Sequence, residues 1–154
     1  MRWAITLGLL LTVVTTNAHS KAASDRERLV GTWRLVSVEA TANDSVSYPL
    51  GRAPSGLLVF TNSGHWAAEL MGEAHAGNAG DPRATYRGHF GTFTVDPGQR
   101  LLTLHRTGDL DRAGIDADTL RYYTFEGQRV VMRLPPERRQ GAEVVTRVTW
   151  ERVD

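Results

Sequence analysis

The chain has 154 residues, of which 41% are hydrophobic, a length and composition that suit one domain with one sizeable core. Lysine and arginine number 18 against 17 aspartates and glutamates. This balance leaves no basic excess to displace counterions from a phosphate backbone, so nucleic acid is not an expected partner. The sequence has no cysteine, which excludes disulfides, thiol nucleophiles and thiolate metal ligands.

The first residues have the pattern of a secretory signal peptide. Arg2 precedes an apolar run from Trp3 to Val14, and small and polar residues follow as far as Ser24. The run is shorter than the roughly 20 residues that span a bilayer, so we expect no stable membrane span after processing, with a retained anchor as the alternative. We therefore expect residues 1–22 to be a signal peptide, residues 23–154 to be one domain, and the protein to be periplasmic or secreted. The cleavage positions that fit are those after Ala18, Ala22 and Ala23.

The mature chain is predicted to be all-β after one short helix. The helix is predicted over Ser24 to Leu29, because Ser24 and Glu27 form a capping-box pattern. From Gly31 onward, runs rich in Val, Thr, Leu and aromatic residues are broken by Gly, Pro, Asn and Asp, which is typical of antiparallel strands. The eight predicted strands are Gly31–Ala40, Gly56–Thr61, His65–Met71, Tyr86–Val95, Arg100–Thr107, Asp118–Glu126, Arg129–Leu134 and Glu143–Val153.

Three of the connections between these strands have the residues of tight hairpins. They are Asn62-Ser63-Gly64, Asp96-Pro97-Gly98 and Glu126-Gly127. Longer loops are predicted over Thr41–Ser55, Gly72–Thr85 and Gly108–Ala117. Sequential hairpins favour a closed, eight-stranded, antiparallel up-and-down barrel over an open sandwich. A barrel of eight strands is filled by its own side chains or holds one small ligand.

The order of motifs resembles a known family. Gly31-Thr32-Trp33 opens the first strand in the manner of lipocalin and calycin barrels. The motifs that follow in order are Tyr48-Pro49-Leu50-Gly51, Pro54-Ser55-Gly56, Phe60-Thr61-Asn62-Ser63-Gly64, Tyr86, Gly91-Thr92-Phe93, His105, Arg121-Tyr122-Tyr123, Pro135-Pro136 and Thr149-Trp150-Glu151-Arg152. Together they resemble the bacterial lipocalin-like domain family. The resemblance implies a barrel around a central cavity, and some fungal relatives take part in ring-forming or isomerising steps. Export is a departure, because many members look cytosolic.

The last strand predicts how the barrel closes. Val144, Thr146, Val148, Trp150 and Arg152 share one face, which is the more apolar and should point inward. In a closed barrel this strand pairs with the first, which brings Arg152 beside Trp33. Lipocalin-like barrels lay an arginine across this tryptophan, a contact worth about 0.5 to 2 kcal/mol. We interpret the pair as structural.

Five polar or aromatic residues are the predicted ligand-binding set: His105, Arg121, Tyr123, Tyr86 and Glu69. His105 and Arg121 interrupt β-favouring segments on adjacent strands, so they are expected to form a polar spot inside an apolar cup. An inward arginine needs a partner such as Glu69 or the anionic group of a ligand. Tyr86 and Tyr123 would add an aromatic wall with hydroxyl donors. The alternative is that both strands are one residue out of register and His105 and Arg121 face water.

We expect no metal and no cofactor. His65, His75, His89 and His105 show no paired ligand spacing, and His65 and Glu69 lie about 13 Å apart on their strand. The segment from Asp109 to Gly114 begins like a calcium loop but lacks the later oxygen ligands.

The predicted function is therefore binding of a small hydrophobic or amphipathic molecule in the barrel. One alternative is an isomerase or cyclase in which His105 is the general acid or base. The other is a structural or interaction module with a filled interior. The sequence lacks a Gly-x-Ser-x-Gly elbow, so hydrolysis by a serine nucleophile is not expected.

Overall fold

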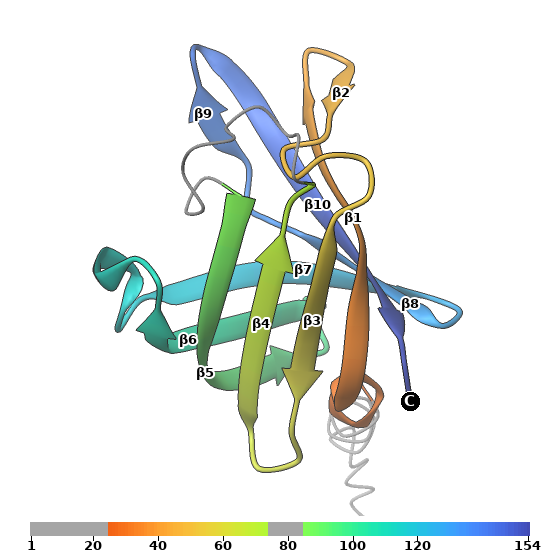
Figure 1. Ribbon diagram of the computed structural model, residues 1–154. Coiled ribbons are helices and arrows are strands. Elements are labelled where there is room, and N and C mark those ends of the chain that lie inside the picture. The colour runs from red at the N-terminus through yellow and green to blue at the C-terminus, as the bar shows by residue number, and fades with distance from the viewer. Residues whose placement is uncertain (1–24, 74–84) are drawn as a thin grey trace, which may run out of the picture.

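The computed structural model describes residues 25–73 and 85–154. Eight long antiparallel strands form one sheet that closes on itself, because β1 pairs with both β3 and β10 (Figure 1). The strands are β1 (Gly31–Ala42), β3 (Ser55–Phe60), β4 (His65–Met71), β5 (Tyr86–Asp96), β6 (Leu101–Asp109), β7 (Asp118–Glu126), β8 (Arg129–Arg133) and β10 (Ala142–Arg152). The prediction of an eight-stranded barrel is confirmed.

Two short strands extend the sheet beyond the prediction. β2 (Ser45–Ser47) pairs with the end of β1, and β9 (Glu137–Arg139) pairs with the start of β10. Each is joined by a two-residue turn in which both residues have positive φ, Asn43-Asp44 and Gln140-Gly141. Such turns match the twist of a hairpin, and they place β2 in the predicted loop Thr41–Ser55 and β9 between the last two predicted strands. The three predicted hairpins are also present, between β3 and β4, β5 and β6, and β7 and β8.

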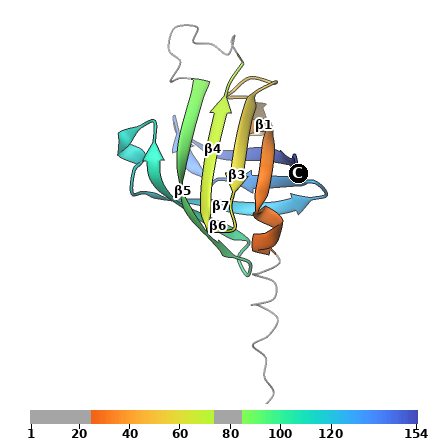
Figure 2. The same cartoon turned by 60° about the horizontal axis from the view of Figure 1, so that its bottom comes forward.

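The two walls of the barrel differ in direction. Figure 2 shows β1, β3, β4 and β5 on the near side, with β6 and β7 passing behind them. In Figure 1 the N-terminal helix, the C-terminus and the β3–β4 hairpin lie at the lower end of the barrel. The extensions β2 and β9 lie at the upper end, and the 3₁₀ helix η1 (Arg112–Gly114), which follows β6, lies at the side. We call the lower end the closed end and the upper end the open end.

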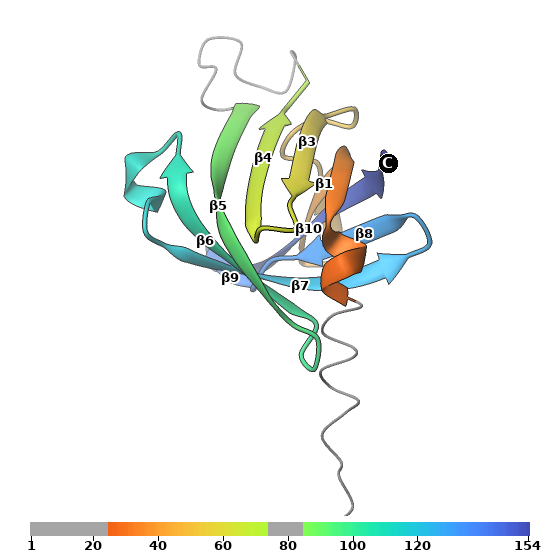
Figure 3. The same ribbon diagram turned by 90° about the horizontal axis from the view of Figure 1, so that it is seen from below.

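The closed end is packed around Trp33. A helix over residues 25–29 lies across this end (Figure 3), and the indole of Trp33 donates a hydrogen bond to the Leu29 carbonyl at 2.8 Å. The predicted pairing of Trp33 with Arg152 is confirmed, with the guanidinium carbon 4.3 Å from the ring centroid. Arg152 also donates to the Val30 carbonyl at 3.1 Å. A Cβ on Gly31 would lie 2.5 Å from the Arg152 guanidinium, so the Gly-x-Trp motif leaves room for the arginine.

A second polar contact fixes the helix to the barrel wall. The hydroxyl of Tyr123, on β7, donates to the Asp25 carboxylate at 2.7 Å, and both residues are buried. Burial and the Asp25 carboxylate raise the pKa of the Tyr123 hydroxyl, which keeps it a donor. The expected cap at Ser24 lies outside the described residues, as does the predicted signal peptide. Within the described residues, no helix has the length and apolar character needed to cross a membrane.

Candidate functional site

A cavity of about 300 Å³ lies inside the barrel toward the open end. Five of its 17 lining residues are polar, which leaves 12 that are apolar. The polar residues are Arg87, His89, Arg121, Arg139 and Thr146. Val148 and Trp150 line the cavity together with Thr146, which confirms the predicted inner face of the last strand. A volume at the lower end of small-molecule sites admits a compact organic ligand, not a large one.

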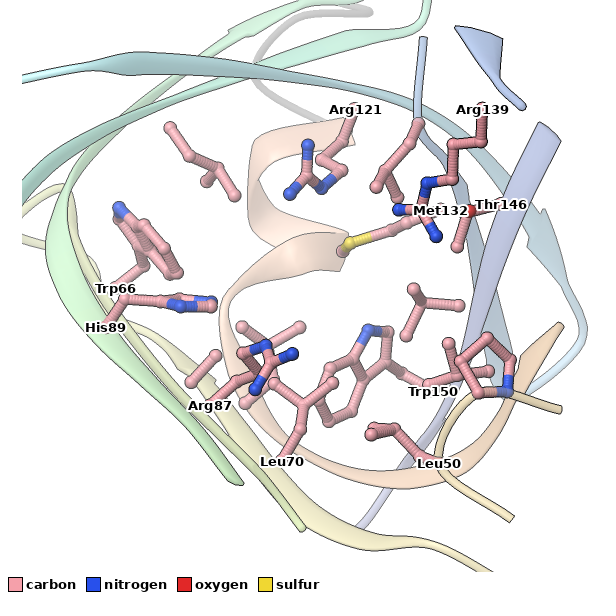
Figure 4. Close-up of a pocket in the computed structure, with 17 residues that line it drawn as sticks. Leu50, Trp66, Leu70, Arg87, His89, Arg121, Met132, Arg139, Thr146 and Trp150 are labelled. Atoms are coloured by element: carbon pink, nitrogen blue, oxygen red, sulfur yellow. The ribbon is translucent and has the colours of Figure 1, made fainter. Parts of the chain in front are cut away.

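Arg121 is a half-buried cation that lines the cavity. Arg121 is two positions before the buried Tyr123 on β7, so both side chains lie on the inner face of the strand. Figure 4 shows the guanidinium of Arg121 directed at the open space. The group donates to the Leu120 carbonyl at 2.8 Å, and no carboxylate of the described chain pairs with it. Burial and the nearby Arg106 guanidinium lower the pKa of Arg121 to about 10. The side chain is still a cation at neutral pH, in a place that disfavours charge.

Two further arginines enter the cavity nearer its mouth. In Figure 4, Arg139 lies on the same side of the open space as Arg121, and Arg87 lies on the opposite side. Both are exposed to solvent, and Arg139 forms an ion pair with Glu137 at 2.5 Å. No aspartate or glutamate among the described residues lines the cavity. The charged lining residues are therefore all arginines, and although Glu137 offsets the charge of Arg139, Arg87 and the half-buried Arg121 favour an anionic guest.

His89, on β5, forms part of the cavity wall beside Trp66. The two rings are 5.2 Å apart between centroids and are tilted by 54°. Burial lowers the pKa of His89 to about 4, and nearby arginines add to this effect while Asp109 opposes it. The imidazole is therefore neutral at pH 7. The indole nitrogen of Trp66 is buried with no hydrogen-bond partner in the described chain.

The region behind His89 contains a partly buried ion pair. Asp109 is the cross-strand neighbour of His89, and its carboxylate accepts hydrogen bonds from the Arg106 guanidinium and from the backbone of Asp111, the latter at 2.9 Å. Asp111 in turn caps η1 by accepting from Ala113. The carboxylates at the start of the calcium-like segment thus have partners within their own loop. No group of three or more His, Asp or Glu residues in the described ranges is placed to hold a metal.

The structure divides the predicted ligand-binding set. Of the five residues, Arg121 lines the cavity. His105 lies on the outer surface, 2.9 Å from the Asp118 carboxylate, with 43% of its side chain exposed. Glu69 is exposed on the outer face of β4, and Tyr86 lies outside over Gly88. Tyr123 points inward, but its hydroxyl donates to the Asp25 carboxylate at the closed end and does not line the cavity.

His89 lines the cavity but is not in the predicted ligand-binding set. Its spacing from the other histidines argues against a metal site, whereas its place on the strand indicates the inner face. Phe93 is a strongly apolar residue of the same strand, four positions away, so alternation places the two on one face. The even spacing between His89 and Phe93 therefore predicts that His89 faces the interior of the barrel.

Comparison with known proteins gives a family match over the whole barrel. A model of the lipocalin-like domain matches residues 30–153, which include every strand from β1 to β10. A solved structure of a redesigned β-barrel is similar over 84% of this chain and 95% of that chain, with 13% sequence identity and a TM-score of 0.43. No curated protein matches the chain.

Proposed function

This chain belongs to the family of lipocalin-like domains, and we propose that it binds a small, mainly hydrophobic molecule with an anionic group in its barrel and that it is exported. Export is inferred from Arg2, the apolar run and the small residues that follow it, all outside the described residues. The anionic group is inferred from the cavity itself.

The observation that carries the ligand class is the guanidinium of Arg121, which points into the cavity inside the barrel. A buried cation is costly unless an opposite charge and hydrogen-bond acceptors compensate for lost water. The described chain supplies one backbone carbonyl and a second arginine nearby, but no carboxylate. A carboxylate or similar anion in the cavity would supply the missing charge, and the 12 apolar lining residues would cover the rest of the molecule.

The cavity also weighs against the alternative of a filled structural module. Trp66, Trp150 and Met132 are large side chains that line the space without occupying it. A barrel that served only as a scaffold would gain stability from filling such a space, because cavities cost packing energy.

A fluorescence titration tests the proposal. Trp66 and Trp150 line the cavity, so their emission should change when it fills. The ligands are decanoate and its methyl ester, which differ in charge at one end. A charge-assisted contact worth about 1.5 to 3 kcal/mol predicts that decanoate binds roughly 10- to 150-fold more tightly than the ester.

The matched variants are Arg121→Met and Arg147→Met. The first should remove the preference for decanoate, and the second should keep it, because Arg147 is exposed on the outer face of β10. Equal affinities of the unaltered protein for acid and ester would contradict the anionic ligand class. Loss of the preference in both variants would show that general surface charge attracts the acid.

A further inference from the structure

His89 and Arg121 stand in different walls of one apolar cavity. His89 comes from β5 and Arg121 from β7, with β6 between them in the sheet. In Figure 4 the imidazole and the guanidinium are both directed toward the open centre, where a guest molecule would contact both. Neither group forms an ion pair within the described chain. The imidazole contacts Trp66, and the guanidinium donates to a backbone carbonyl.

The two groups are complementary in proton chemistry. A neutral imidazole accepts a proton, whereas an arginine remains a cation and stabilises a developing negative charge. The charged groups around His89 are Asp109 and Arg106, behind it, and Arg121 and Arg87, which line the cavity with it. Burial is the main cause of the low pKa of His89, and the three arginines add to it while Asp109 opposes it, so the imidazole is neutral and can accept a proton at pH 7.

We propose that His89 and Arg121 make the cavity a proton-transfer site for a small, apolar carbon acid, with His89 as the base and Arg121 as the cation that stabilises the resulting oxyanion. This activity goes beyond binding, and it assigns to His89 the role that the sequence analysis considered for His105.

The reaction needs no other reactant. His89 removes a proton from carbon next to a carbonyl, and the electron pair of the broken C–H bond forms a C=C bond. The carbonyl electrons move to oxygen, whose negative charge lies against Arg121. The protonated imidazole then returns the proton to another carbon of the conjugated system, which re-forms the carbonyl. The net change is an isomerisation, with no oxidation or reduction.

A nitrobenzisoxazole is a suitable probe, because its ring opening depends on one base. His89 would remove the proton from the carbon beside the ring nitrogen. The electrons of that bond form the nitrile, the N–O bond breaks, and its electrons remain on oxygen as a coloured phenolate. The probe is compact and flat, as a cavity of about 300 Å³ with two tryptophans in its wall requires.

Initial rates of the unaltered protein and three variants test the proposal. His89→Gln should lower the rate about 100-fold or more, the usual contribution of a positioned base. Arg121→Met should lower it about 10- to 100-fold by removing stabilisation of the phenolate. His105→Gln is the matched control and should leave the rate unchanged, because His105 lies on the outer surface. The rate should be flat near pH 7 and fall below about pH 5, as His89 gains a proton.

Two outcomes would overturn the proposal: no protein-dependent ring opening, or a rate that His89→Gln leaves unaltered. The result is separable from the test of binding. If decanoate binds and the probe is not opened, the proton-transfer site fails and the binding function stands. If the probe is opened through His89 but decanoate does not bind, the anionic ligand class fails alone. If both hold, decanoate should inhibit ring opening competitively.

Discussion

Arg121 should make the empty protein less stable than an apolar side chain would at the same position. Its pKa falls from the ordinary 12.5 to about 10 on burial. At about 1.4 kcal/mol for each tenfold change in the dissociation constant, this corresponds to roughly 3 kcal/mol against the charged form in the folded state. The hydrogen bond to the Leu120 carbonyl at 2.8 Å returns about 1 kcal/mol. Arg121→Met should therefore raise the free energy of unfolding by about 2 kcal/mol.

The pH dependence of this gain follows from the sign of the pKa shift. The pKa of Arg121 is lower in the folded protein than in the unfolded chain, so the folded state holds this proton less tightly. The penalty is complete below about pH 10 and declines only as the pH approaches the unfolded value. The gain in stability should therefore be the same at pH 6 and pH 8, to within about 0.5 kcal/mol.

Urea denaturation followed by tryptophan fluorescence measures this difference, with Arg147→Met as the control on the outer face. The control should lie within about 0.5 kcal/mol of the unaltered protein. If Arg121→Met instead lowers the free energy of unfolding by more than about 1 kcal/mol, Arg121 is a structural residue and the reasoning from its burial is refuted.

Three other predictions concern the core, the cavity and the N-terminus. Trp33→Ala should lower the free energy of unfolding by about 3 to 5 kcal/mol in urea melts, because the indole is 2% exposed; a loss below about 1 kcal/mol would remove it from the core. The pKa of His89 is about 4 when folded and 6.5 when unfolded, so its contribution to stability is present above pH 6.5 and is lost as the pH falls through 4. On going from pH 7 to pH 4, the free energy of unfolding should therefore fall by up to about 3 kcal/mol less in His89→Gln than in the unaltered protein, in the same melts. N-terminal sequencing of the processed form should begin between His19 and Ser24, and soluble protein with an intact Met1 would exclude cleavage.

The eight long strands could be predicted because each combines β-favouring residues with a turn that local chemistry specifies. Gly64, with a φ of 86°, and Gly127, with a φ of 61°, occupy turn positions that suit glycine. The short strand β2 escaped prediction because all three of its residues are exposed. Its sequence Ser-Val-Ser has no buried face to impose a pattern, and its pairing depends on the Asn43-Asp44 turn.

The candidate site was harder to predict because it depends on which face each residue takes. Leu102 and Leu104 are buried on β6, so alternation places His105 on the outer face. Likewise Ala68 and Leu70 line the cavity, which directs Glu69, between them, outward. Both placements were open to inference from the largest apolar residues of each strand.

The position of a side chain along the barrel was not open to the same inference. Arg121 and Tyr123 share the inner face of β7, yet one lines the cavity and the other meets Asp25 at the closed end. The alternation of residues along a strand predicts which face of the sheet a side chain takes, but not which end of the barrel it lies at. The difference depends on where the N-terminal helix docks, a contact between residues 98 positions apart.

The contrast between the two ends gives the strongest physical argument for a ligand. At the closed end the buried polar groups have partners: Tyr123 with Asp25, and Arg152 with main-chain carbonyls. Toward the open end, the Arg121 guanidinium faces the cavity and has no carboxylate partner in the described chain. Because a fold gains stability by pairing or removing such a charge, the position of Arg121 is explained if a guest molecule supplies an anion. The destabilisation of the empty protein by Arg121 would then be a consequence of keeping a cation ready to bind an anionic ligand.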